Sequence, residues 1–391
     1  MPTDLAIGIH DLSFSTTSLV LGHDELSRHN GTDIAKYHKG IGQRAMSVPT
    51  ADEDIVTMAA AAAAPIVQRH TADRIRTLVL ATETSIDQSK AAGIYVHSLL
   101  GLPPQVRVVE VKQACYGATA GLQFATALVH RDPAQQVLVI ASDVSRYDLD
   151  SPGEATQGAA AAALLVSADP VLIEIDRPSG LFTSDIMDFW RPNYRSTALV
   201  NGKESVTAYL EAVEGAWRDY NAQGGLPLEE FRAFCYHQPY TRMAFKAHRR
   251  LLEACGVQPD DAAVESAIAA TTGYNETVGN SYTASMYLAL AALLDSGSEL
   301  TGQSLGLFSY GSGSVAEFLA GRLRPGYREH LRGDAHREAV SKRRAIDYGT
   351  YRELHERTLP TDGGWHDLPH QTQGPFRLAG LRDHQRIYET A

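Results

Sequence analysis

The chain has 391 residues, 44% of them apolar, so it is long enough to bury a substantial core, and length alone suggests two or three domains. With 46 acidic against 35 basic side chains the formal net charge is -11, which argues against a nucleic-acid partner because such a surface repels polyanions. No basic segment followed by a long apolar run opens the chain, and its nearly apolar runs, such as residues 59–67, fall short of the roughly 18 to 20 residues of a membrane span. We therefore expect a cytoplasmic protein that does not enter a membrane.

Strand-like and helix-like segments alternate along the first half. The β-rich runs cover residues 75–82, 106–112 and 135–142, and the segments around 88–100 and 117–129 have helical, alanine-rich composition. This alternation predicts a layered α/β fold.

A weak internal repeat divides the chain. ACYGATAGLQFATAL opens a small-residue helix that precedes the strand-like VLVIASDVS, and GNSYTASMYLALAALL precedes LGLFSYGSGS in the same order. The repeat predicts two similar halves, 1–168 and 169–391, with Cys115 and Asn280 at equivalent helix starts. Similarity this faint also arises by chance. From about residue 322 the chain is charged and helical and then rich in Pro and Gly, which we interpret as a packed extension of the second half.

The three cysteines, Cys115, Cys235 and Cys255, are scattered and form no CxxC pair. Their number and spacing predict neither a disulfide framework nor a zinc site. The chain also lacks GxGxxG, P-loop, HExxH and GxSxG motifs, which argues against the common dinucleotide, nucleotide, zincin and hydrolase sites. We expect no metal and no bound cofactor.

Cys115 stands between a predicted strand and a run of very small residues. At the first turn of a helix, the positive end of the helix dipole would favour the thiolate. A thiol pKa lowered from about 8.5 to about 7.5 would raise the thiolate share at neutral pH to roughly a quarter. The alternative is a structural cysteine in a tight core. Cys235, with no helix dipole near it, is interpreted as a core residue.

Two further side chains follow predicted strands, where the sites of α/β proteins collect. His237 stands at the end of the run FRAFCYH, and Glu83 follows IRTLVLAT. A structural or surface histidine and a helix-capping or solvated carboxylate remain the alternatives. The glycine-rich SYGSGS, residues 309–314, could offer backbone N–H groups to an oxyanion, although such loops are common.

Taken together, these segments resemble the 3-hydroxy-3-methylglutaryl-CoA synthases, a branch of the thiolase superfamily, and the resemblance covers nearly the whole chain. DFWRPNY and LAGLRDHQRIY discriminate most, because general thiolases and ketoacyl synthases differ there. The other matching stretches are KYHKGIGQRAMSVPTADEDIVTMA, ATETSIDQSKA, KQACYGATAGLQ, IASDVSRYDLDSPGEATQGAAAAAL, YHQPYTRMAFKA, VGNSYTASMYLAL and LFSYGSGS. The resemblance implies a thiolase-like five-layered αβαβα fold of two similar halves.

The resemblance also implies residue roles. Cys115 would be the nucleophile acylated by acetyl-CoA, Glu83 the general acid and base, and His237 the group that orients and polarises acetoacetyl-CoA. Residues implied around the acyl groups are Tyr147, Asp143, Asp188, Asn280 and Ser312, with Thr156 and Tyr310 less defined in role. A homodimer of the bacterial mevalonate pathway would follow, using coenzyme A thioesters as substrates.

The helix predicted after His237 carries the basic residues Arg242, Lys246, Arg249 and Arg250 in an acidic protein. We expect Arg242 and Lys246, one turn apart on the same side, to contact the phosphates of coenzyme A. An ordinary solvated helix face is the alternative. Two other functions stay open: condensation on an acyl carrier protein in polyketide β-branching, and a catalytically silent acyl-binding protein with the same fold.

Overall fold

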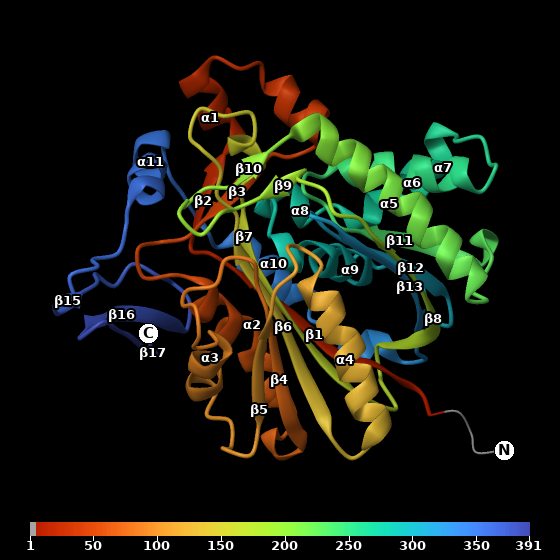
Figure 1. Ribbon diagram of the computed structural model, residues 1–391, viewed down its shortest axis with the longest axis horizontal. Coiled ribbons are helices and arrows are strands. Elements are labelled where there is room, and N and C mark those ends of the chain that lie inside the picture. Colours follow the sequence, from red (N-terminus) through yellow and green to blue (C-terminus); the bar gives the residue numbers. More distant parts are fainter. Residues whose placement is uncertain (1–4) are drawn as a thin grey trace.

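A continuous nine-stranded mixed sheet organises the computed structural model, which describes residues 5–391 (Figure 1). Each half of the chain forms one part of it, and these parts are called the first and second sheet below. In each sheet two antiparallel pairings are followed by parallel pairing, so the two halves repeat one topology. The sheets touch only where β1 and β8 pair over two residues. The first sheet runs in the order β1 (Ile7–Thr16), β7 (Ala159–Ala168), β6 (Gln136–Val144), β4 (Ile75–Ala81) and β5 (Arg107–Val111). The second runs β8 (Ile173–Thr183), β13 (Val315–Leu323), β12 (Ser304–Gly311) and β11 (Phe231–Tyr236).

Three helical layers alternate with these sheets. Helices α4 (Gly117–Arg131) and α9 (Ser285–Asp295) share one buried core with the facing sides of both sheets. Helix α2 (Ile55–Arg69) packs on the outer face of the first sheet, and α5 (Gly202–Ala222) with α6 (Arg242–Ala254) on the outer face of the second. Because alternate strand residues point to opposite faces, each sheet contributes side chains to two hydrophobic cores. The predicted five-layered fold of two similar halves is therefore confirmed.

The sequence of helix α9 explains why this helix is buried between the two sheets. Ten of its eleven residues are buried, and its sequence SMYLALAALLD lacks a polar face. A helix that is apolar all round is stable only when it is surrounded by protein. Its amphipathic counterparts on the outside, such as α5 and α6, bury one face each.

Shorter elements complete the chain. In the first half these are β2 (Leu19–Gly22), α1 (His23–Asn30), β3 (Ala45–Val48) and α3 (Gly93–Leu99). In the second half they are β9 (Phe189–Trp190), β10 (Leu199–Val200), α7 (Asp261–Ile268) and α8 (Asn275–Val278). The C-terminal part adds α10 (Gly333–Ser341), β14 (Arg344–Ala345), α11 (Tyr348–Glu356), β15 (His366–Asp367), β16 (Phe376–Arg382) and β17 (Gln385–Thr390).

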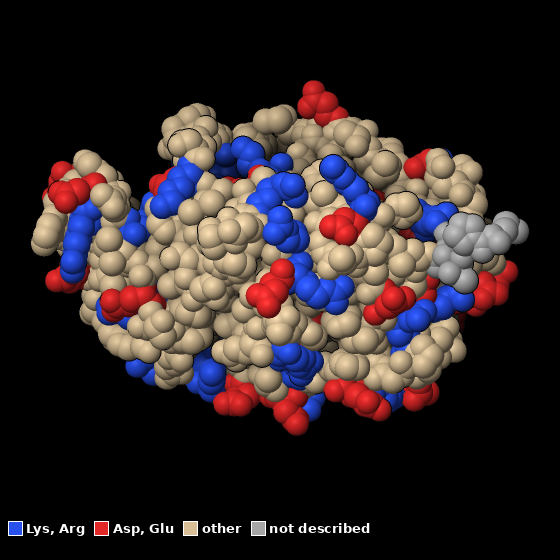
Figure 2. All heavy atoms as spheres, turned by 90° about the horizontal axis from the view of Figure 1, so that it is seen from below, with Lys and Arg blue, Asp and Glu red and all other residues tan. Residues whose placement is uncertain are grey.

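The surface seen from below has mixed charge. Figure 2 shows acidic and basic side chains interspersed among uncharged ones on this face. A mixed face creates no single-sign field that would gather a polyanion there. Within residues 5–391, no helix is long and apolar enough to cross a bilayer.

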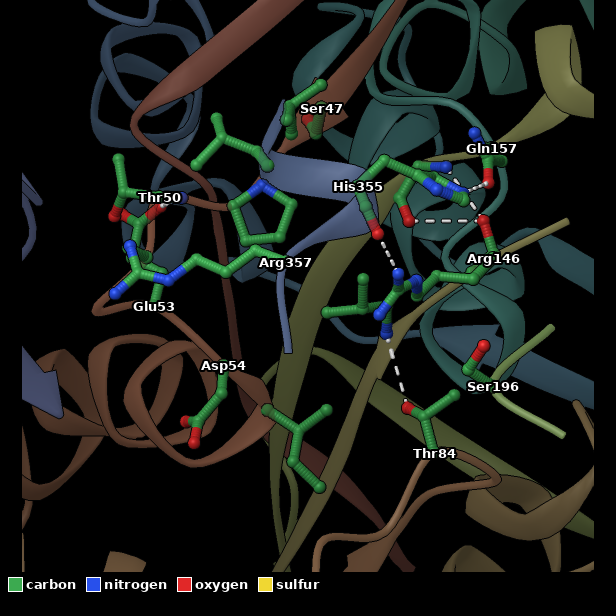
Figure 3. A pocket seen from close by; sticks show the side chains of 18 of the residues that line it. Ser47, Thr50, Glu53, Asp54, Thr84, Arg146, Gln157, Ser196, His355 and Arg357 are labelled. Carbon is green, nitrogen blue, oxygen red and sulfur yellow. Dashed lines mark hydrogen bonds between the residues drawn. The ribbon is translucent and has the colours of Figure 1, made fainter. Parts of the chain in front are cut away.

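The C-terminal extension packs against the first half of the chain. Residue 322 still belongs to β13, so the extension starts after Leu323. It then returns to the first half, where β14 pairs with β2, and β16 and β17 pack against α2 and α3. Together with the first half it encloses a cavity of about 320 Å³ that Thr50, Thr84 and His355 help to line (Figure 3).

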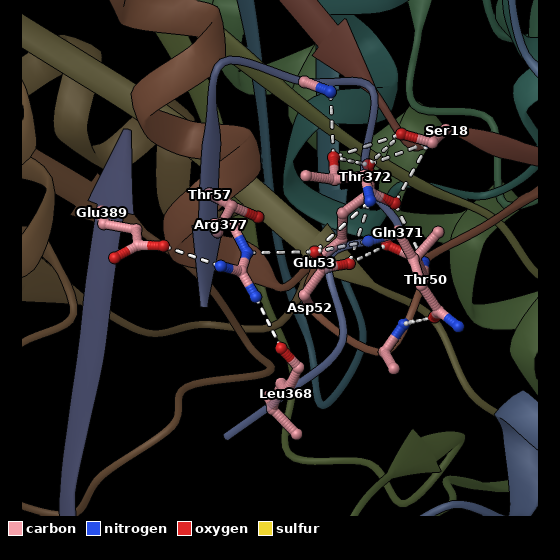
Figure 4. A network of polar contacts seen from close by, with 12 residues as sticks. Ser18, Thr50, Asp52, Glu53, Thr57, Leu368, Gln371, Thr372, Arg377 and Glu389 are labelled. Carbon is pink, nitrogen blue, oxygen red and sulfur yellow. Dashed lines mark hydrogen bonds and ion pairs between the residues drawn. The ribbon is translucent and has the colours of Figure 1, made fainter. Parts of the chain in front are cut away.

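Buried carboxylates hold this extension in place (Figure 4). Asp52, fully buried, accepts hydrogen bonds from the backbone N–H groups of Gln371 and Thr372 at 3.0 and 3.1 Å. It also forms an ion pair with the Nε of Arg377 at 3.5 Å. Because water cannot replace these partners in the interior, the carboxylate fixes the extension to the loop before α2.

We expect Asp52→Ala to lower the free energy of unfolding by about 2 to 4 kcal/mol, because the buried N–H of Thr372, the N–H of Gln371 and a guanidinium lose their acceptor. Urea unfolding measures the change. The matched control is Glu389→Gln, which removes the half-exposed partner on the other side of Arg377 and should change stability by less than about 0.5 kcal/mol. Equal effects of the two substitutions would contradict the assignment.

Candidate active site

A cavity of about 540 Å³ lies where the two halves meet. The first half contributes Cys115, Tyr147 and Thr156, and the second contributes His237, Asn280, Tyr310 and Ser312 to its lining. Its size is typical of sites for small molecules. Seven of the twelve residues singled out in the sequence therefore surround one space.

Cys115 stands on a loop between β5 and α4, before the helix instead of inside its first turn. Helix α4 begins at Gly117 with Tyr116 as N-cap, and Ala114 has the left-handed φ of 41°. The end of β12 covers this loop closely, because a Cβ added to Gly311 would lie 2.5 Å from the carbonyl oxygen of Gln113. Glycine is required there, and the thiol is held in one place.

The thiol donates a hydrogen bond to Glu83, with 3.0 Å between Sγ and Oε1. Burial raises the pKa of the Cys115 thiol well above its ordinary value, and the neighbouring Glu83 charge raises it further. Burial, helped by Asp143, also raises the pKa of Glu83 to about 8. The predicted thiolate at the helix start is therefore wrong, because desolvation and two carboxylates outweigh the helix dipole. Cys115 and Glu83 form a proton-sharing pair instead.

Asp143 supports this pair from behind and does not line the cavity. It is fully buried, and its Oδ1 accepts hydrogen bonds from the backbone N–H groups of Glu83 and Thr84 at 2.9 and 3.1 Å. Its Oδ2 accepts from the backbone N–H and hydroxyl of Thr283. Its oxygens are thus engaged by protein, and the expected contact with substrate is replaced by a positioning role.

His237 follows β11 directly, as the sequence predicted. Its backbone is fixed on both sides, since its N–H donates to Phe308 and its carbonyl accepts the hydroxyl of Tyr209 at 2.7 Å. Burial lowers the pKa of the imidazole to about 3, so the ring is neutral at physiological pH. A neutral ring can donate one N–H to a developing oxyanion without carrying charge into an apolar site.

Aromatic side chains keep the space around the thiol apolar. Cys115 packs in one buried cluster with Tyr147, Phe189, Ala198 and Tyr282. Burial raises the pKa of the Tyr147 phenol, so this hydroxyl stays protonated beside Cys115. Low water content strengthens every electrostatic contact inside the cavity.

The end of β12 and the turn after it contribute Tyr310 and Ser312 to the wall of the cavity. Tyr310 donates its hydroxyl to Asp188 at 2.9 Å, and Asp188 also accepts the backbone N–H of Gly313 at 2.9 Å. Asp188 is fully buried and lies behind the lining, so it holds the Ser312 turn in position and does not face the cavity.

The predicted basic residues lie outside this cavity. Arg242 and Lys246 line a separate surface hollow. Lys246 is nevertheless near the cavity, because its Nζ donates to the hydroxyl of Tyr240, a lining residue, at 3.1 Å. Arg249 and Arg250 form ion pairs with Asp261 and Glu214, whereas Lys246 and Arg242 form none within residues 5–391.

Sequence reasoning missed several residues of the site. Tyr209 donates its hydroxyl to the carbonyl oxygen of His237 and lies in the stretch MDFWRPNYRSTALVNGKESVTAYL, which also resembles the family, but no role was assigned to it. Phe189 and Arg191 belong to the quoted DFWRPNY, and Arg191 donates to the carbonyl oxygen of Glu83 at 2.9 Å. Tyr282 follows Asn280 with a left-handed φ of 46°. The DFWRPNY stretch was therefore a site signal whose geometry only the fold reveals.

Comparison with known proteins identifies the family. Residues 2–170 match the model of the hydroxymethylglutaryl-coenzyme A synthase N terminal region, and residues 256–344 match that of the C terminal region. The chain is 39% identical to the hydroxymethylglutaryl-CoA synthase of Enterococcus faecalis, over 92% of this chain and 94% of the relative. The chain belongs to the hydroxymethylglutaryl-CoA synthase family. It therefore belongs to a family of acyl-CoA condensing enzymes with transferase-type activity.

Two further similarities place it within this family. A hydroxymethylglutaryl-CoA synthase solved in complex with CoA superposes with a TM-score of 0.94 at 36% identity, covering 99% of this chain and 100% of the other. The polyketide biosynthesis 3-hydroxy-3-methylglutaryl-ACP synthase PksG of Bacillus subtilis is 31% identical over 84% of this chain and 83% of the relative. The synthase family thus includes both CoA-type and carrier-type relatives. Among residues 5–391, no group of three or more His, Cys, Asp and Glu side chains is arranged to hold a metal ion.

We expect the alkylation rate of Cys115 by iodoacetamide to rise as the pH increases through about 8, because only deprotonated Glu83 can accept the thiol proton. Glu83→Gln should remove this rise. Mass spectrometry separates Cys115 from the half-buried Cys255, which serves as the internal control in the same samples. A maximal rate already reached at pH 7 in both proteins would mean a stable thiolate and would overturn the proton-sharing pair.

Proposed function

We propose that this enzyme condenses acetyl-CoA with acetoacetyl-CoA to give 3-hydroxy-3-methylglutaryl-CoA and CoA. The observation that carries the proposal is the 3.0 Å contact between Cys115 and Glu83 beside a cavity that His237 also lines. A nucleophile, a base and a neutral hydrogen-bond donor converge there, and the reaction requires these three groups.

Acetylation of Cys115 is the first step. As the thiol attacks the thioester carbonyl of acetyl-CoA, its proton passes to Glu83 along their hydrogen bond. The raised pKa of Glu83 makes its carboxylate a stronger base than an ordinary glutamate. The proton then goes to the departing CoA sulfur, so Glu83 becomes a carboxylate again.

Formation of the carbon–carbon bond uses the same carboxylate. Glu83 removes a proton from the acetyl methyl group, and the resulting enolate attacks the 3-oxo carbon of acetoacetyl-CoA. Cys115 and Ser312 both line the cavity, and their backbone N–H groups would serve the enolate oxygen. Neutral His237, with Asn280, donates to the oxygen that becomes the alcohol, and Glu83 returns its proton there. Water finally hydrolyses the Cys115 thioester.

The proposal extends to the binding of coenzyme A and to the assembly of two copies of the chain. Lys246 and Arg242 lie near the cavity and would receive the phosphates of coenzyme A. A homodimer in the cytoplasm follows from the family resemblance, and β5, which ends the first sheet with Val109 39% exposed, is an edge that a second copy could cover. We infer no cofactor beyond the CoA thioesters.

We expect His237→Ala to slow condensation about 100-fold or more while Cys115 acetylation stays within about tenfold, because the imidazole acts on the second carbonyl. Transfer of label from radioactive acetyl-CoA measures the first step, and 3-hydroxy-3-methylglutaryl-CoA release measures the second. Cys115→Ala should abolish labelling, and Cys255→Ala should retain it as the control. Equal loss of both steps in His237→Ala would contradict its assigned role.

We expect acetoacetyl-CoA to be a better acceptor than acetoacetyl groups on an acyl carrier protein, with a kcat/KM at least tenfold higher, because the cations Lys246 and Arg242 suit a soluble phosphate ligand. Mass spectrometry of products from both acceptors measures this ratio. Preference for the carrier protein would favour the PksG-like reaction, while inactivity with both acceptors would favour a silent acyl-binding protein.

A further inference from the structure

The cavity between the first half and the C-terminal extension is separate from the catalytic cavity and strongly cationic. Its volume is about 320 Å³, and the two linings share no residue. Figure 3 shows Arg146 reaching into it near Thr84 and His355, with Arg357 extending across it toward Thr50 and Glu53. The guanidinium groups on its walls belong to Arg146, Arg191, Arg357 and Arg386.

The carboxylates of this cavity are already occupied. Glu53 accepts from the backbone N–H and hydroxyl of Ser18 and from the hydroxyl of Thr372. Asp54 caps α2 and accepts the hydroxyl of Tyr388. Neither carboxylate forms an ion pair with a lining arginine, because both accept hydrogen bonds from backbone N–H and hydroxyl groups instead.

Three of the four arginines form no ion pair within the described residues. Arg146 donates to the carbonyl oxygen of His355, and its buried Nε has no partner. Arg191, which is exposed, donates to the carbonyl oxygen of Glu83, and its charge lowers the pKa of the Glu83 carboxyl; Arg357 is exposed as well. Arg386, by contrast, is paired with Asp87 at 2.6 Å. The partly buried Arg146, with an unpartnered Nε, is the cation that an anion would stabilise most, and the exposed Arg191 and Arg357 add positive charge on the same lining.

The surroundings favour a phosphate-class ligand. Guanidinium groups bind phosphate oxygens in a bidentate manner, and the hydroxyls of Ser47, Thr84 and Ser196 add neutral donors on the same lining. Apolar side chains such as Ile55, Ile86 and Leu378 complete the walls, which suits a small organic group on the phosphate.

We propose that this cavity binds a small phosphorylated molecule or free phosphate through Arg146, Arg191 and Arg357. The site abuts the catalytic machinery from behind, because Arg191 donates to the Glu83 carbonyl oxygen and the Nε2 of His355 donates to the carbonyl oxygen of Tyr147, 3.0 Å away. Its occupant would therefore rest on the backbones that carry two active-site side chains.

Calorimetric titration with inorganic phosphate at constant ionic strength tests the site, with glycerol phosphate as the second probe. Arg146→Gln and the surface variant Arg357→Gln should each weaken phosphate binding about tenfold or more. The matched control is Arg218→Gln on α5, whose side chain is 73% exposed, and its affinity should equal that of the unchanged protein. Tighter binding of glycerol phosphate would assign an organic ligand, and tighter binding of inorganic phosphate would assign the free ion.

Phosphate titration in the presence of saturating CoA tests whether this site is distinct from the CoA-binding region. We expect phosphate affinity to be unchanged when CoA fills the catalytic cavity, and Lys246→Gln to have no effect on it. Absence of saturable binding, displacement of phosphate by CoA, or loss of binding in Lys246→Gln but not in the two arginine variants would overturn the proposal. Because Arg357 is exposed, its variant tests the site even if Arg146→Gln fails to fold.

Discussion

The hydrogen bond from the Cys115 thiol to the Glu83 carboxylate is the contact on which the catalytic account depends. Both groups are buried, so neither charge is well solvated, and Glu83 raises the cost of ionising Cys115, whereas the hydrogen bond from the thiol favours the Glu83 carboxylate. Once Glu83 has lost its own proton, the thiol proton is the one that lies between the two groups. The nucleophile is therefore activated by a base at the moment of reaction, and a permanently ionised sulfur is unnecessary.

The remaining structure serves to bring this pair and His237 to one cavity. Each half contributes the end of a central strand or the loop before a central helix, and the buried helices α4 and α9 bring these ends together. Close backbone contacts fix the arrangement. Gly158 is one of them, because an added Cβ would lie 2.4 Å from the carbonyl oxygen of Val278, just before Asn280. The reaction thus needs both halves of the repeat.

Sequence patterns predicted much of this, and the reasons for the failures are physical. Strands such as β4 and β11 and the buried helix α9 were readable because composition and periodicity are local. The electrostatic state of Cys115 was not readable, because it depends on two carboxylates that are distant in the sequence. Glu83 is 32 residues away, and Asp143, which binds the Glu83 backbone, is on a different strand. The sequence indicated a packed extension but not its partner, which is the first half, where Asp52 accepts from Gln371, more than 300 residues away in sequence. Long-range pairings of this kind leave no periodic signal.

The most direct measurement of the central claim is the protonation state of the Cys115 sulfur in the resting enzyme. Carbon-13 NMR of protein labelled at cysteine Cβ, assigned with Cys115→Ala, reports it at pH 7. We predict the chemical shift of a neutral thiol, which changes only as the pH rises well above 8. A thiolate shift at pH 7 would contradict the account, because the sulfur would then have no proton to give to Glu83.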